Sequence, residues 1–167
     1  MSRFLAILAI TVPFIAPTAV AADDYKFRAQ LTGDNEVPAV ETDTEGRAEV
    51  RFTSDGLEAA IRLEVRDGVR VTQAHLHCAP EGENGPIVAF LAGFHELGWD
   101  LDGRWIDDAT LTDDNVLPTD PKIDPSCPET IETLRDIGLA ALDGNIYVNV
   151  HTVGNAGGEV RGQLEVD

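Results

Sequence analysis

Two histidines at alternate positions of one short segment are the residues best suited to carry chemistry. His75 and His77 lie in the sequence AHLHC, residues 74–78. Successive side chains of a β-strand point to opposite faces, so the two imidazoles share one face and the small apolar residues share the other. We expect the apolar face to pack on a core, and the imidazoles to lie together on the polar side or at the rim of a pocket.

A third histidine follows the same pattern in another predicted strand. In residues 146–151, apolar side chains alternate with polar ones, and His151 is on the polar face. Imidazole is a common ligand of copper and zinc, and two histidines from one strand face offer two nitrogens together. We predict a transition-metal site of His75, His77 and His151, with His95 as a candidate fourth ligand. The Irving–Williams order favours copper, with zinc as the alternative. A purely structural interpretation is that these imidazoles hydrogen-bond the neighbouring loops.

Composition limits the classes of protein that the chain can belong to. Its 167 residues suffice for one domain, and its formal net charge of -18 makes nucleic acid and anionic membrane surfaces poor partners. The sequence has no G-x-S-x-G motif, no Ser-His-Asp order at a recognisable spacing and no phosphate-binding glycine loop. Hydrolase and nucleotide chemistry are therefore disfavoured, and whether the protein is an enzyme stays open.

The first 21 residues have the pattern of a secretory signal peptide. Arg3 precedes an apolar run over residues 4–15, and Ala19-Val20-Ala21 matches an A-x-A cleavage site. A retained N-terminal anchor is the disfavoured alternative. We expect residues 22–167 to form an exported domain, periplasmic or extracellular, with no membrane span in the mature chain.

Two cysteines in an exported chain predict one disulfide, between Cys78 and Cys127. Such a bond would join the end of the histidine-bearing strand to a proline-rich loop. The alternative is that Cys78 is a soft metal ligand beside His77. We rank it lower because adjacent residues of a strand face opposite ways.

Alternating apolar residues and closely spaced turn signals predict an all-β fold, an antiparallel β-sandwich of Greek-key type. Turn signals at Ser54-Asp55-Gly56 and at Asp67-Gly68 predict that three consecutive strands form a meander. Residues 94–128 are predicted to be a long loop insertion, with a candidate strand at 104–111. One short helix is expected over 129–142, before the penultimate strand, with Pro128 near its start and Gly144 just beyond its end. The other predicted strands cover residues 25–31, 46–52, 57–66, 69–78, 87–91, 145–153 and 160–166.

The sequence resembles the CHRD (chordin) domain over residues 27–164. Four segments carry the resemblance: FRAQLTGDNEVPAVET, GRAEVRF, AHLHCAPEGENGPIV and GNIYVNVHTVGNAGGEVRGQL. CHRD domains occur as repeats in the extracellular antagonist chordin and singly in exported microbial proteins. The resemblance implies a β-sandwich of immunoglobulin-like or Cu/Zn superoxide dismutase-like architecture, but no single biochemistry. Here a cysteine follows the HLH pair where glycine is usual, and the segment after Phe94 is long, which suggests a disulfide-stapled lid.

Three hypotheses for the function follow. The first is an exported metal-binding protein, with copper favoured. The second is a non-catalytic extracellular module that binds a protein through its end loops or the Trp99–Trp105 segment. The third is a redox enzyme, because the histidine pattern is similar to the copper ligation of Cu/Zn superoxide dismutase. Arg161 is a candidate for steering an anion there, but the strongly negative surface would repel superoxide.

Overall fold

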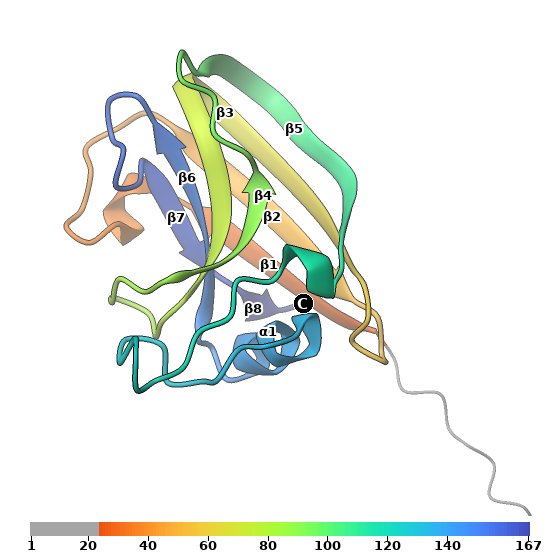
Figure 1. Ribbon diagram of the computed structural model, residues 1–167. Helices are drawn as coiled ribbons and strands as arrows, with labels where there is room; N and C mark the ends of the chain where they lie inside the picture. The colour runs from red at the N-terminus through yellow and green to blue at the C-terminus, as the bar shows by residue number, and fades with distance from the viewer. Residues whose placement is uncertain (1–23) are drawn as a thin grey trace, which may run out of the picture.

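The computed structural model describes residues 24–167, so the predicted signal peptide, residues 1–21, lies outside the described part. Within this part eight strands form one antiparallel sheet, and a single α-helix, α1 (Leu134–Leu142), precedes β6 (Figure 1). Two short 3-10 helices, η1 (Gly33–Asn35) and η2 (Asp113–Asn115), lie in connections. The strands are β1 (Tyr25–Leu31), β2 (Glu45–Phe52), β3 (Ala59–Cys78), β4 (Ile87–Ala92), β5 (Trp99–Leu111), β6 (Ile146–Thr152), β7 (Val160–Gln163) and β8 (Glu165–Val166).

Strand β3 organises the sheet, because its 20 residues belong to two layers. Its first half pairs with β2 and β5, and its second half pairs with β6 and β4. One layer is therefore β5-β3-β2-β1-β8 and the other is β4-β3-β6-β7. The sheet nearly closes on itself, because Thr32 after β1 exchanges two backbone hydrogen bonds, of 3.1 and 3.2 Å, with Arg161 of β7. The predicted all-β antiparallel fold is confirmed.

The predicted hairpin at Asp67-Gly68 is wrong. The chain continues in the same direction there, and the pairing of β3 with β5 shifts register on both sides of Gly68. Asp67 and Arg70 both have a φ of 51°, in the left-handed region. A single left-handed residue bends and twists a strand, whereas a tight two-residue hairpin turn of type I′ needs two left-handed residues in succession. The segments 57–66 and 69–78 are thus two halves of one bent strand.

Two other boundaries differ from those expected. The strand expected over 104–111 begins earlier, at Trp99, because β3 offers β5 a long pairing edge. The predicted insertion 94–128 therefore contains β5 between two loop segments. Helix α1 begins at Leu134 and not near Pro128, because Thr133 and Asp136 form a capping box. The helix ends before Gly144, which has a φ of 75° as a residue after a helix often does.

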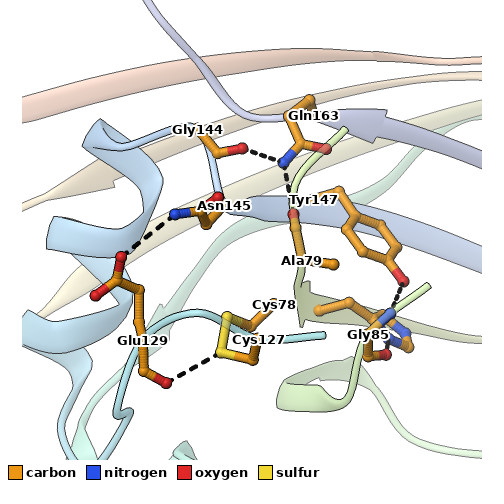
Figure 2. The surroundings of a disulfide bond; sticks show 10 residues. Cys78, Ala79, Gly85, Cys127, Glu129, Gly144, Asn145, Tyr147 and Gln163 are labelled. Carbon is orange, nitrogen blue, oxygen red and sulfur yellow. Dashed lines mark hydrogen bonds between the residues drawn. A yellow bond between two sulfur atoms is a disulfide. The ribbon is translucent and has the colours of Figure 1, made fainter. Parts of the chain in front are cut away.

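The predicted disulfide between Cys78 and Cys127 is present, and both residues are fully buried. It joins the end of β3 to the loop that leads into α1 (Figure 2). The hydrophobic core lies between the two layers, where the inner faces of the strands meet. Helix α1 covers one end of this core, and Gly138 lies close to the ring of Phe52.

Gly162 is expected to be required for the near closure of the sheet. A Cβ atom at this position would lie 2.1 Å from the backbone oxygen of Gln30 in β1. We predict that Gly162→Ala lowers the free energy of unfolding by about 2–4 kcal/mol, measured by urea denaturation, because backbone must move to relieve the clash. The control is Gly157→Ala, whose Cβ would meet nothing within 4 Å. Equal stability of the two variants would contradict this close approach.

Candidate metal centre

The three predicted ligands lie together on the outer face of the layer β4-β3-β6-β7. His75 and His77 come from β3 and His151 from β6, the next strand of the layer. The register pairs His75 with Asn149, so His151 is a diagonal neighbour on the same face. One ring nitrogen from each histidine can be chosen so that all three lie within 4.8 Å of one another. The shared face predicted from alternation is correct.

The cluster is buried, which the strand pattern alone did not predict. The exposed fractions of His75, His77 and His151 are 1%, 8% and 5%. Loops from distant parts of the chain contact the cluster and its surroundings. Segment 79–86 contacts His77, segment 153–158 contacts His151, and η1 with the loop after it lies against β7 (Figure 1). The imidazoles therefore lie under loops, not at an open rim.

The hydrogen bonds define the protonation of the rings. His77 Nδ1 lies 2.9 Å from the backbone oxygen of Gly85, and His151 Nδ1 lies 3.1 Å from that of Ala156. A carbonyl oxygen only accepts, so both Nδ1 atoms donate, and in a neutral ring each Nε2 then carries a lone pair. His75 Nδ1 lies 3.0 Å from His151 Nε2 and donates to it, which leaves a lone pair on His75 Nε2.

Two of these lone pairs have no partner. Among residues 24–167, the buried Nε2 atoms of His75 and His77 have no hydrogen-bond partner. Burial lowers the pKa of His75 from 6.5 to about 3 and the pKa of His77 to about 4, and repulsion from the neighbouring imidazoles adds to both shifts. Burial also lowers the pKa of His151. All three rings are neutral at neutral pH, and the neutral ring is the form that binds a metal.

The spacing of the nitrogens fits a metal with little rearrangement. Nitrogens bound to zinc at about 2.0–2.1 Å in tetrahedral geometry lie about 3.3 Å apart, and at most about 4.1 Å apart when they are on opposite sides of the ion. Because His75 Nδ1 donates to His151, the lone pair that His75 can offer a metal is on its Nε2. One nitrogen from each ring lies within 4.8 Å of the others, so ligands of one tetrahedral ion would move toward one another by about 1.5 Å or less. The residues present therefore fit a three-nitrogen site.

Tyr147 and Arg161 extend the cluster across the layer. The ring of Tyr147 stacks on His77 with centroids 4.9 Å apart, and the guanidinium carbon of Arg161 lies 4.9 Å from the centroid of the same ring. Because β3, β6 and β7 are successive strands, Tyr147 lies between His77 and Arg161. The Tyr147 hydroxyl accepts a hydrogen bond of 3.2 Å from the backbone nitrogen of Gly85 (Figure 2). Gly85 thus holds both rings in place.

A buried carboxyl group, Glu36, lies near Arg161 and Asn149, and no sequence pattern predicts its burial. Burial raises its pKa to about 7, although the charge of Arg161 and a hydrogen bond from Asn149 act in the opposite direction. Its Oε1 has no hydrogen-bond partner among residues 24–167. Glu36 lies in an irregular loop after η1, where no periodicity indicates which side chains face inward.

His95 does not join the other three histidines. It lies in the segment between β4 and β5, where its ring stacks on Trp99 with centroids 4.0 Å apart. Trp99 and Trp105 are themselves neighbours, with centroids 6.1 Å apart. Cys78 is also unavailable as a ligand, because its sulfur is in the disulfide. The candidate site therefore consists of His75, His77 and His151.

The fold and the site define an antiparallel β-domain that is stapled by a disulfide and carries a buried histidine cluster outside its hydrophobic core. A family model described as the CHRD domain matches residues 27–164, so the chain belongs to the CHRD family. CHRD is an extracellular type of interaction domain, and the disulfide fits an exported protein. Comparisons with curated proteins and with solved structures found no match. No helix among residues 24–167 has the length and apolar character needed to cross a membrane.

Proposed function

We propose that this exported CHRD protein binds a transition metal, with copper favoured over zinc, through His75, His77 and His151. The observation that carries the proposal is the meeting of three neutral, buried imidazoles, two of which have an Nε2 without a partner among residues 24–167. A buried polar atom without a partner costs about 1–3 kcal/mol. A metal ion that accepts these lone pairs removes this cost.

The chemistry of the donor set supports copper or zinc over other ions. Calcium and magnesium prefer carboxylate and carbonyl oxygens, whereas imidazole suits copper and zinc. Each Nδ1–H of His77 and His151 is held by a backbone carbonyl, an arrangement that orients the rings of metal-binding histidines. Ordered water could also satisfy the free lone pairs. The two cases differ in how the protein responds to added metal.

Titration of residues 22–167, with the disulfide intact, tests the proposal. We expect stoichiometric binding of Cu(II) or Zn(II) by calorimetry, and at least about a 100-fold loss of affinity in His75→Ala/His77→Ala, because only one ligand remains. The matched control is His95→Ala, which removes a histidine outside the cluster and should bind as the wild type does. An absence of binding, or equal weak binding by wild type and double variant, would assign the cluster a structural role.

Binding of another protein is the second candidate function. It is favoured by the exposed surface around Arg70, Phe94 and Leu97, which we call the tip of the molecule. Leu97 and Phe94 are strongly exposed, at 69% and 67%. Arg70 ties this tip together, since its Nε donates to the oxygen of Leu97 and its own oxygen accepts from the nitrogen of Val153. Partner capture that survives loss of the histidines but not Phe94→Ser/Leu97→Ser would assign this function.

A further inference from the structure

The geometry and the charges around the cluster point to a more specific ligand. We infer that the site holds copper as Cu(I) in preference to Cu(II) and Zn(II). This inference rests on the metal site proposed above. Three features of the structure carry it: a donor set without charge, burial of the ligands, and a fixed positive charge nearby.

The donor set does not neutralise a bound ion. In the described residues, the group that could hold a metal contains three histidines and neither a carboxylate nor a thiolate. Cys78 follows His77 directly, but its sulfur is bonded to Cys127. Sulfur ligands are those that select Cu(I), whereas imidazole binds copper in either oxidation state, so the ligand type does not itself favour Cu(I) here. A bound ion keeps its full charge, +1 or +2, and the surroundings of the site decide which is tolerated.

Burial favours the lower charge. The ligand side chains are at most 8% exposed, so a bound ion loses most of its contact with water. The cost of moving an ion into a medium of low dielectric constant rises with the square of its charge, so it is about four times larger for a divalent ion than for a monovalent one. The acidic outer surface attracts both ions, but its charges lie in solvent and are screened.

Arg161 adds a positive charge that cannot be removed. Its side chain is 3% exposed, and arginine does not lose its proton in proteins. Its guanidinium donates to neutral oxygens, namely the backbone oxygens of Asn35 and Glu83 and the Oδ1 of Asn84. No carboxylate in residues 24–167 lies within 4.0 Å of it.

The charge of Arg161 reaches the ligands. The guanidinium of Arg161 is separated from His77 by the ring of Tyr147. Its positive charge disfavours protonation of His77 and so helps to lower the pKa of this imidazole. Two carboxyl groups oppose this charge, and neither belongs to the candidate ligands. Burial raises the pKa of Glu36 to about 7, and the carboxylate of Glu159 keeps its charge while it accepts hydrogen bonds from Thr42, Thr152 and Asn155.

The number of ligands agrees with the charge argument. Structural zinc sites have four protein ligands, zinc sites with three protein ligands take a water as the fourth, and Cu(II) prefers a tetragonal arrangement. The cluster supplies three nitrogens, and His95, the remaining histidine, lies elsewhere. Cu(I) has a filled d shell and is satisfied by three donors. It therefore needs no additional ligand from the solvent.

Comparison of the three affinities tests the inference. Under anaerobic conditions, Cu(I) binding is measured by competition with a coloured Cu(I) chelator, and Cu(II) and Zn(II) binding by competition with chelators of known affinity. We expect Cu(I) to bind at least 100-fold more tightly than Cu(II), which raises the one-electron potential of bound copper by about 120 mV over the free couple. Equal or tighter binding of Cu(II) would overturn the inference and leave the metal site standing. Failure to bind any of the three ions would overturn the proposed function itself.

Variants of Arg161 separate its charge from its hydrogen bonds. Arg161→Gln should reduce the Cu(I) preference at least tenfold, about 59 mV in potential. Arg161→Lys keeps the charge and should retain the preference. The control is Arg70→Gln, an exposed arginine at the tip of the molecule, which should change nothing. Folding of each variant is checked by circular dichroism. If Arg161→Gln does not fold, the ratio of Cu(I) to Cu(II) affinity of the wild type alone decides the inference. If Arg161→Gln folds and has the same ratio as the wild type, the charge of Arg161 does not cause the preference.

Discussion

Acidification from pH 7 to pH 5 is expected to lower the free energy of unfolding of the metal-free protein by at least about 2 kcal/mol. His75 and His77 have folded-state pKa values of about 3 and 4, against 6.5 ordinarily. Below pH 6.5 the unfolded chain binds protons that the folded chain cannot, so stability is lost as the pH falls through 6.5 toward 4. Each of the two residues then contributes a loss of about 2 kcal/mol at pH 5. The pKa of His151 is lowered too, so its effect has the same sign.

Glu36 acts in the opposite direction. Its pKa is raised from 4.5 to about 7, so between these values the folded state binds the proton more readily than the unfolded chain does. Its contribution to stability is full below pH 4.5 and is lost as the pH rises through 7, which offsets about 2 kcal/mol of the histidine effect at pH 5. Glu36→Gln removes this offset. The loss of stability between pH 7 and pH 5 should therefore be about 2 kcal/mol larger in that variant.

Urea denaturation at pH 7 and pH 5, in the presence of a metal chelator, measures these differences. In His75→Gln/His77→Gln the loss of stability caused by these two rings at pH 5 should disappear, and the remaining Glu36 and His151 should act in opposite directions. His95→Gln, which lies outside the cluster, should keep the pH dependence of the wild type. If the free energy of unfolding is the same at pH 7 and pH 5 in both the wild type and Glu36→Gln, burial does not hold the three rings neutral.

The shared face of the histidines could be predicted, and their burial could not. Alternation along a strand has a period of two, so the side on which His75 and His77 lie follows from their spacing. Burial depends on the loops after β1, β3 and β6, whose sequences have no period that indicates where they fold. The same limit explains why Glu36 was missed. It is buried by contacts with β6 and β7, which are far from it in sequence.

Two of the differences in the fold arise from local signals with more than one structural outcome. Asp67-Gly68 is typical of a hairpin, but left-handed residues also occur at bulges, and the pairing of β3 with β5 on one side selects the bulge. Pro128 is compatible with a helix start, yet the capping box at Thr133 satisfies the first backbone groups of α1. The disulfide was easier to predict, because an exported chain with two cysteines allows one intramolecular pairing.

Replacing both cysteines, as Cys78→Ala/Cys127→Ala, is expected to lower the free energy of unfolding by about 4 kcal/mol. The bond closes a loop with a sequence separation of 49 residues, and a loop of this length restricts the unfolded chain by about that amount. Both sulfurs are fully buried, so the loss of their packing adds to the effect. Urea denaturation of the double variant and of the oxidised wild type at pH 7 measures the difference. A loss below about 1 kcal/mol would contradict this account.

The same variant should separate the stability of the fold from the geometry of the site. His77 precedes Cys78, but its backbone is held by the pairing of β3 with β6, and its Nδ1 is held by Gly85. Neither contact involves the sulfur atoms. We therefore expect the affinity for copper, measured under conditions where the variant is folded, to change by less than about threefold. A much larger loss would mean that the disulfide positions the ligands, and that the loop carrying Cys127 is part of the site.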